Sequence, residues 1–258
     1  MRYFKQIIVV LFTIIYIPLA LNAKEMFDRE ASSQPDMVYI SAGEFIMGSD
    51  KGDSDEQPKH IVYLDGYYID KYEVTFTQYD KFCEATGRIK PGDEGWGRGD
   101  IPVVNVSWED ANSYCQWVGK RLPTEAEWEK AAKAGSNADY CFGDLKSELS
   151  KYAWYKSNSD ERLHRVGQRK PNQWGIYDMY GNVWEWCRDW YDKDWYKQSP
   201  KQNPQGPGFG IVKAIRGGSF TSWVEHHPLE YSCRSANRYA DVISAKYADY
   251  GFRCVKNE

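Results

Sequence analysis

The sequence has no block of basic residues, no long apolar run after residue 21 and no cysteine pair spaced as CxxC. Its 33 Lys and Arg stand against 37 Asp and Glu, for a net charge of −4. Because phosphate backbones are bound through clustered Lys and Arg, we expect no nucleic-acid partner. Glycine and proline, 21 and 11 residues, are too few for a fibrous repeat. With 42% hydrophobic residues, the chain is predicted to be globular and to form one domain.

The long apolar run that does occur lies at the N-terminus. Arg2 and Lys5 precede apolar residues 7–21, and Ala23 stands before a charged pair. This order is typical of a secretory signal peptide, which we predict over residues 1–23. An uncleaved anchor is the alternative, although the run falls short of the roughly 20 residues that span a bilayer. We therefore expect a periplasmic or secreted protein with no stable membrane span after cleavage.

Residues 24–36 are polar and are predicted to be a flexible lead-in to a domain over residues 37–258. The six cysteines of the chain would lie in an oxidising compartment, where an even number favours disulfides. No CxxC spacing points to zinc or to a thioredoxin-like site. The spacing alone does not select a pairing.

Three helices are predicted from capping boxes, in which a Ser or Thr side chain and the residue three positions later bind each other's backbone N–H. The helices begin after Thr75, Ser107 and Thr124, and each continues with apolar residues at helical spacing. Gly87 is expected to end the first helix and Gly135 the third. Such a cap typically contributes about 1 kcal/mol.

Short strands are predicted elsewhere. Residues 37–47 indicate a strand or hairpin, and runs 60–64 and 67–69 are separated by Asp65-Gly66, which favours a tight turn. A last strand pair is suggested by residues 211–216 and 252–255. After residue 136, tryptophans stand among Asn, Asp and Gly, which suggests long loops held by aromatic packing. These patterns predict an α+β domain with little regular secondary structure.

Six motifs occur in one order, and together they resemble the formylglycine-generating enzyme family, also called sulfatase-modifying factors. The resemblance covers residues 37–256. It implies a fold akin to that of C-type lectins, bound calcium and, for the best-known branch, an oxidase that uses oxygen and copper to convert a sulfatase cysteine into formylglycine. The motifs are residues 43–48, 70–75, 119–129, 175–186, 216–220 and 251–253.

The resemblance also implies a structural calcium site. Asp178, Gly181, Val183 and Glu185 match the family's ligands position by position, and calcium prefers such a mixture of carboxylate and backbone oxygens. Asp178 replaces an amide that is common in the family. The alternative is that these acids are only solvated loop residues. A second calcium loop of the family is shorter here and its ligands do not carry over, so we predict one site.

A disulfide between Cys115 and Cys254 is likewise implied by the resemblance. Cys233 matches another bridged family cysteine, but its usual partner position holds Ala132. The remaining cysteines leave two alternatives open for Cys233, namely Cys141 and Cys187.

The sequence departs from the family at the catalytic position. Copper-using members carry two cysteines shortly after Gly-Gly-Ser, because soft thiolates suit Cu(I). Here the first position is Ser222, and the second falls at His227 or one residue to either side. A serine hydroxyl is a poor Cu(I) ligand, so this metal site cannot be assembled from these side chains.

Other residues offer a different chemistry at this place. Glu225, His226 and His227 cluster there, and imidazole with carboxylate suits copper, iron or zinc, or proton transfer; an exposed polar loop is the alternative. Ser219 and Asp249 match positions that line the family's active cleft. His60 and His164 are interpreted as structural.

Three functions are compatible with these observations. The first is an exported maturation factor that oxidises a peptide or protein substrate without the cysteine-pair copper site, using copper or iron. The second is a non-catalytic, calcium-braced binding module with an aromatic surface. The third is a true formylglycine generator acting on sulfatases. In each case we expect a monomer.

Overall fold

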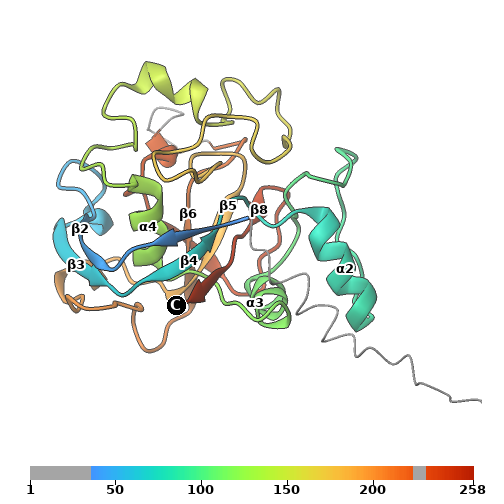
Figure 1. Ribbon diagram of the computed structural model, residues 1–258, viewed down its shortest axis with the longest axis horizontal. Helices are drawn as coiled ribbons and strands as arrows, with labels where there is room; N and C mark the ends of the chain where they lie inside the picture. The colour runs from blue at the N-terminus through green and yellow to red at the C-terminus, as the bar shows by residue number, and fades with distance from the viewer. Residues whose placement is uncertain (1–35, 223–230) are drawn as a thin grey trace, which may run out of the picture. The chain divides into compact units, whose positions relative to one another are not determined.

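The computed structural model describes residues 36–222 and 231–258, with three small sheets and three α-helices (Figure 1). The site rests on a four-stranded sheet in the order β7-β6-β5-β8. Strand β5 (Trp184–Trp190) pairs antiparallel with β6 (Val212–Arg216) and parallel with β8 (Tyr250–Gly251), and β6 pairs antiparallel with β7 (Tyr239–Val242). The parallel pair brings the chain just before residue 250 next to the start of β5.

Two smaller sheets lie beside it. Strand β4 (Tyr67–Asp70) is central in the first, between β1 (Met37–Ile40) and β9 (Val255–Asn257), and both of its pairings are antiparallel. In the second, β2 (Gly43–Met47) pairs with β3 (His60–Leu64). The last residues of the chain thus join the first sheet of the domain.

All three predicted helices form, and each has its complete capping box. Helix α2 (Phe76–Thr86) ends at Gly87 in the left-handed conformation, as predicted. Helix α3 (Trp108–Trp117) packs on α2, and both lie together at one side of the ribbon (Figure 1). Helix α4 (Glu125–Lys133) ends at Ala134, one residue before the predicted glycine. Four short 3-10 helices complete the elements: η1 (Ser54–Glu56), η2 (Lys146–Lys151), η3 (Trp195–Lys197) and η4 (Tyr231–Cys233).

Two strand pairings suggested by the sequence are wrong. Asp65-Gly66 connects β3 to β4, but these strands belong to different sheets and do not form a hairpin. Strand β6 pairs with β5 and β7, whereas residues 255–257 pair with β4. Strand β4 pairs instead with β1 and β9, and β6 with the strands before and after it in the chain, which local turn chemistry does not reveal.

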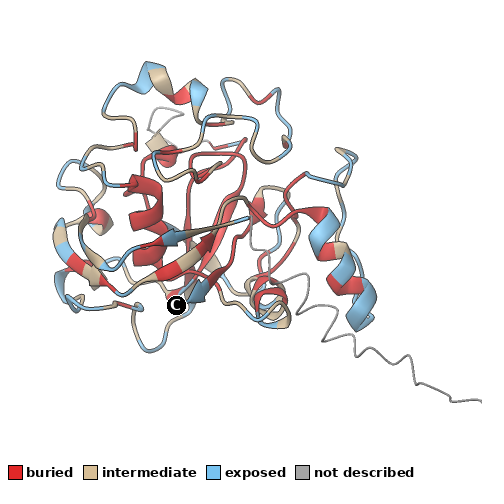
Figure 2. Ribbon diagram, viewed as in Figure 1, coloured by how far each residue is buried: buried red, intermediate tan, exposed pale blue. Residues whose placement is uncertain are grey.

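The core surrounds α4 and β5, where most of the ribbon is buried (Figure 2). Every residue of α4 is buried, including its charged ones. Arg216 on β6 binds Glu125 and Glu129 at 2.8 and 2.7 Å, and Lys133 binds Glu129 at 2.7 Å. Burial alone would raise the pKa of Glu129, but these two cations hold it at about 2.

One disulfide, between Cys115 on α3 and Cys254, joins the helix to the chain end before β9, as the resemblance implied. The other four cysteines are buried thiols, so the expectation of further bridges does not hold in the described part of the chain. Among the residues that the structure describes, no helix is long and apolar enough to cross a membrane. The predicted signal peptide and residues 24–35 lie outside the described residues.

Candidate functional site

The Gly-Gly-Ser turn follows β6 directly. Gly217 and Gly218 have φ of +101° and +73°, which favour glycine. A β-carbon on Gly218 would lie 2.9 Å from Cys233 Sγ and 3.2 Å from Ser222 Oγ. The turn therefore needs glycine both for its conformation and for its close packing, and it places Ser222 and Cys233 against the same residue.

The structure brings three predicted site residues together at this turn. Ser219 Oγ donates to Asp249 Oδ2 at 2.8 Å and lies 3.3 Å from Ser222 Oγ. Thr221, which the sequence analysis missed, also donates to Asp249 Oδ2 at 2.8 Å. Asp249 reaches the turn because its carbonyl accepts from Trp184 N at the start of β5. The result is a small cluster of hydroxyl groups around one carboxylate.

Ser222 has a structural role in this cluster, because it is hydrogen-bonded to Ser219. Its hydroxyl accepts a hydrogen bond from Ser219 N, its own N–H donates to Ser219 O at 3.2 Å, and it is 3% exposed. The side chain therefore closes the turn on itself and does not point to solvent. A hydroxyl is a hard ligand, so this position does not fit the Cu(I) ion that the family resemblance implies.

Glu225, His226 and His227 lie in residues 223–230, outside the described residues. The other two histidines make local contacts that agree with a structural role. His164 stacks on Trp154 with ring centroids 3.6 Å apart and binds Ser159 O at 2.8 Å. His60 Nδ1 lies 2.9 Å from Pro58 O.

The predicted calcium loop runs from residue 178 to 185 and is hydrogen-bonded to the Gly-Gly-Ser turn. Gly181 N donates to Gly217 O at 2.8 Å, which ties the two segments together. A β-carbon on Gly181 would lie 2.0 Å from Trp154 O, so only glycine fits here. Asp178 and Asn182 have φ of +57° and +60°, a conformation that Asn and Asp tolerate better than most residues.

Two acidic side chains of this loop are buried. Glu185 binds Arg253 through both oxygens, with two contacts of 2.7 Å, and also accepts from Trp128 Nε1 at 2.8 Å. Asp178 Oδ2 accepts from Gly167 N at 2.7 Å, but its buried Oδ1 has no hydrogen-bond partner among the residues that the structure describes. Such an unsatisfied buried carboxylate oxygen calls for an explanation.

A third buried carboxylate, which the sequence analysis missed, belongs to the same group. Glu73 accepts from Asn182 Nδ2 at 2.8 Å and from Val183 N at 3.3 Å. Burial first, and then the charges of Asp178 and Glu185, raise the pKa of Glu73 well above its ordinary value. Its only sequence signal was its place inside a family motif, because no periodic pattern marks an acid between a strand and a helix.

Negative charge exceeds positive charge in this group. Three carboxylates face Arg253, the one described cation that is hydrogen-bonded to them. Arg169, which stacks on Trp154 at 3.4 Å, acts on Asp178 only through space. If all three acids are ionised, one negative charge is left over among the described residues even with Arg169 counted, and the raised pKa of Glu73 means that protonation can remove it. A bound cation would be the other way to balance this charge.

The donor chemistry of two side chains suits calcium. Among the described residues, Asp178 Oδ1 has no hydrogen-bond partner, and Glu185 Oε1 accepts one hydrogen bond, which leaves one lone pair. With the main-chain oxygens of Gly181 and Val183 they make up the set that the resemblance implied. Calcium binding by this loop stays a prediction.

Asn182 connects this loop to its surroundings. Its Nδ2 donates to Glu73 at 2.8 Å and to His164 O at 3.2 Å, and its Oδ1 accepts from His164 N at 3.1 Å. Its carbonyl accepts from Phe220 N at 2.9 Å. One residue of the predicted calcium loop thus positions both the Gly-Gly-Ser turn and the segment around His164.

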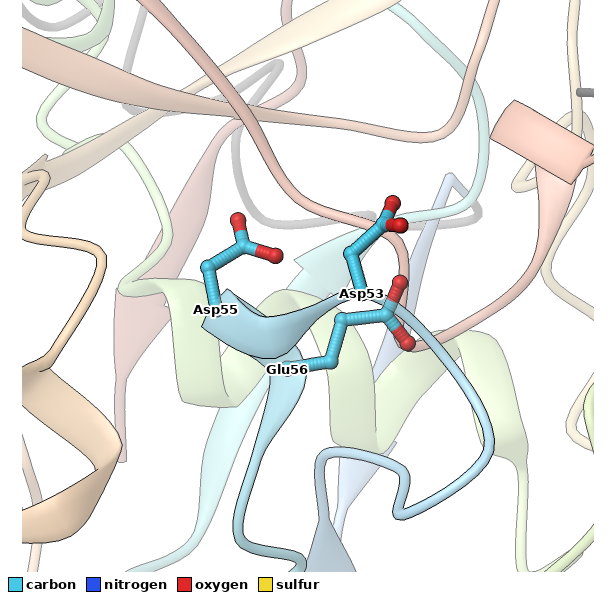
Figure 3. A group of neighbouring side chains, drawn as sticks. All are labelled: Asp53, Asp55 and Glu56. Carbon is cyan, nitrogen blue, oxygen red and sulfur yellow. The ribbon is translucent and has the colours of Figure 1, made fainter. Parts of the chain in front are cut away.

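A further group of acids lies elsewhere, on η1. Asp53, Asp55 and Glu56 place carboxylate oxygens within 4.8 Å of one another, and the carboxylates of Asp53 and Glu56 point to the same side (Figure 3). Glu56 is paired with Arg234, one contact being 2.9 Å, and Asp55 accepts from Tyr191 at 2.7 Å. These hydrogen bonds give Asp55 and Glu56 a structural role, without a metal ion.

The mixed sheet with its Gly-Gly-Ser turn and acid-rich loop belongs to a domain of the class seen in PvdO, an α+β domain with short strands and long loops. The chain belongs to the sulfatase-modifying factor enzyme 1-like domain family, which it matches over residues 22–258. The α+β class and the family expected from the motifs are confirmed.

Individual relatives agree with this membership. The formylglycine-generating enzyme of Streptomyces coelicolor is 31% identical, over 85% of this chain and 88% of that protein. The serine/threonine-protein kinase pkn1 of Chlamydia pneumoniae is 35% identical over 93% of this chain, which spans 41% of that protein's length. Among solved structures, PvdO from Pseudomonas aeruginosa has a TM-score of 0.76 at 29% identity, with 87% of this chain and 95% of that one covered.

Proposed function

We propose that the chain is a calcium-braced domain that binds a polypeptide at its Gly-Gly-Ser turn without cysteine-copper oxidation. The observation that carries this proposal is the position of the Ser222 hydroxyl. Its buried hydroxyl closes the turn at the position where copper-using relatives need a thiolate. The Cys233 thiol lies against the same glycine, but it is buried and matches a bridged position in the family.

The surroundings of the turn support binding of a chain-like ligand. Tyr239 and Tyr247 are about half exposed, at 49% and 51%. The ring of Tyr239 packs on Trp184 with ring centroids 5.4 Å apart, and Trp184 N donates to Asp249 O at 2.8 Å, so this ring lies near the cluster. Aromatic rings offer large contact area at low entropic cost, and the Ser and Thr hydroxyls offer hydrogen bonds to a peptide backbone.

A formylglycine generator is the second candidate, because a named formylglycine-generating enzyme shares 31% identity over most of both chains. An oxidative maturation factor that uses the histidine cluster also remains a prediction, since those residues lie outside the described part. Both candidates require oxygen consumption coupled to change of the substrate. The binding proposal requires none.

Export is part of the proposal. The disulfide between Cys115 and Cys254 supports it, because structural disulfides persist in oxidising compartments and are rare in the cytosol. The apolar run at residues 7–21 supports it independently. Periplasmic and secreted locations are both compatible with these features.

The test uses the full mature chain with calcium and a cysteine-containing sulfatase peptide. Binding is measured by fluorescence anisotropy, and oxygen uptake is measured after loading with Cu(I) or Fe(II). We expect binding without oxygen uptake. Uptake that is lost on changing His226 and His227 to Ala would favour the histidine-based oxidase instead, and uptake with formation of an aldehyde would favour the formylglycine generator.

A further inference from the structure

A second feature beside the turn is a cleft of about 300 Å³ lined by residues of two loops. Trp96 and Ile101 come from the loop between α2 and α3, and Arg162, Leu163 and Arg165 from the loop that follows η2. Val166 N donates to Asp100 O at 3.0 Å and holds the two loops together. The cleft is therefore built by fixed backbone contacts.

Positively charged side chains line the cleft. Arg162 and Arg165 are exposed, and neither guanidinium makes an ion pair or hydrogen bond with any described residue. His164 and Gln168 also line the cleft, whereas none of its described lining residues is an Asp or Glu. Other exposed cations, such as Lys90 and Lys151, are paired with a carboxylate. Two neighbouring free guanidinium groups are well suited to bind a carboxylate.

An apolar wall stands next to these charges. Trp96 is half buried and packs edge-on against Phe220, with ring centroids 5.2 Å apart. Ser159 Oγ donates to Phe220 O at 3.0 Å, so the arginine loop is also anchored to this residue. Phe220 directly follows Ser219, which places the cleft immediately beside the Gly-Gly-Ser turn.

The arginine loop has an unusual backbone at this place. Asp160 and Glu161 both have φ of +54°, a conformation that is rare for glutamate and less unfavourable for aspartate. His164 Nε2 lies 2.8 Å from Ser159 O and closes the loop on itself. Consecutive residues with this backbone that present two arginines to a cleft agree with a binding loop.

We propose that this cleft selects acidic peptides: it binds an Asp or Glu side chain through Arg162 and Arg165, while an adjacent apolar residue packs on Trp96. This proposal rests on the proposed function, because it assigns the ligand class of the same turn. A free small anion would leave the apolar wall unused. A peptide in which acidic and apolar residues alternate uses both parts of the cleft.

The test compares three fluorescein-labelled peptides that differ at one residue type. Phe alternates with Glu in the first, with Gln in the second and with Lys in the third. We expect the Glu peptide to bind about tenfold more tightly than the Gln peptide, as for a charge-assisted bidentate contact. The difference should shrink at high salt because the arginines are exposed.

Variants distinguish the contribution of the two arginines to peptide binding from that of Trp96. Changing Arg162 and Arg165 together to Gln should abolish the preference for Glu, while the melting temperature stays unchanged because both side chains are exposed. Arg188→Gln is the matched control, since Arg188 is an exposed arginine that does not line this cleft. Trp96→Ala should weaken the Glu and Gln peptides alike.

The outcomes distinguish the two proposals. If the Gln peptide binds as tightly as the Glu peptide, or if the double arginine variant keeps the preference, the acidic selectivity is wrong while polypeptide binding stands. If none of the three peptides binds, the proposed function is wrong and the ligand class assigned to the cleft falls with it.

Discussion

Replacing Ser222 by Ala tests the role assigned to its hydroxyl. The variant removes the acceptor of Ser219 N inside a turn where both residues are buried. A buried N–H left without a partner costs about 1–3 kcal/mol. For a domain of this size, each kcal/mol lowers the melting temperature by about 2–4 °C. We therefore expect a drop of several degrees, measured by thermal and urea unfolding.

Thr221→Ala is the control for this measurement. Thr221 also bonds within the cluster, but it is exposed, and water can replace its hydroxyl at Asp249. Its loss should cost less than about 1 kcal/mol. If Ser222→Ala is as stable as the wild-type protein, or no less stable than Thr221→Ala, then the hydroxyl does not hold the turn and the reasoning about this position fails.

Three further predictions concern the scaffold. Calcium should raise the melting temperature, by an amount equivalent to about 2.7 kcal/mol at a hundredfold excess over its Kd; Asp178→Ala should lose this shift and Asp53→Asn should keep it, and equal shifts in both variants would contradict the site. Because the pKa of Glu129 is about 2 against an ordinary 4.5, its ion pairs stabilise the fold above pH 4.5, and roughly 3 kcal/mol is lost as the pH falls toward 2. Urea unfolding across this range should show a flatter profile for Glu129→Gln, and an unchanged slope would refute the assignment. Changing Cys115 and Cys254 together to Ser should cost roughly 4–5 kcal/mol in the chain-entropy model, and a variant with unaltered unfolding in urea would show that the bridge has no such effect.

The helices could be predicted from sequence because their signals are local. Thr75, Ser107 and Thr124 each lie three residues before their capping partner, and all three boxes form. Strand pairing depends on residues far apart in the chain, so Asp65-Gly66 gave a misleading hairpin. The pairing of β4 with the C-terminal β9 has no local signal at all.

The candidate site could be predicted only in part for the same reason. Ser219, Ser222 and Asp249 were found through the family motifs, and they do meet at the turn. Glu73 and Thr221 were missed because neither stands out by spacing or residue type. The arginine cleft was missed because it forms only when two loops, about sixty residues apart in sequence, are joined by hydrogen bonds.

The most direct test of the central claim is the fate of a bound peptide cysteine. The mature protein, loaded with calcium and supplied with Cu(I) and oxygen, is incubated with a cysteine-containing peptide, and the peptide mass is followed. We predict that the peptide binds and that its mass does not change. Conversion of its cysteine to an aldehyde, at a rate proportional to the protein concentration, would contradict the claim that Ser222 has replaced the copper-binding chemistry of this family.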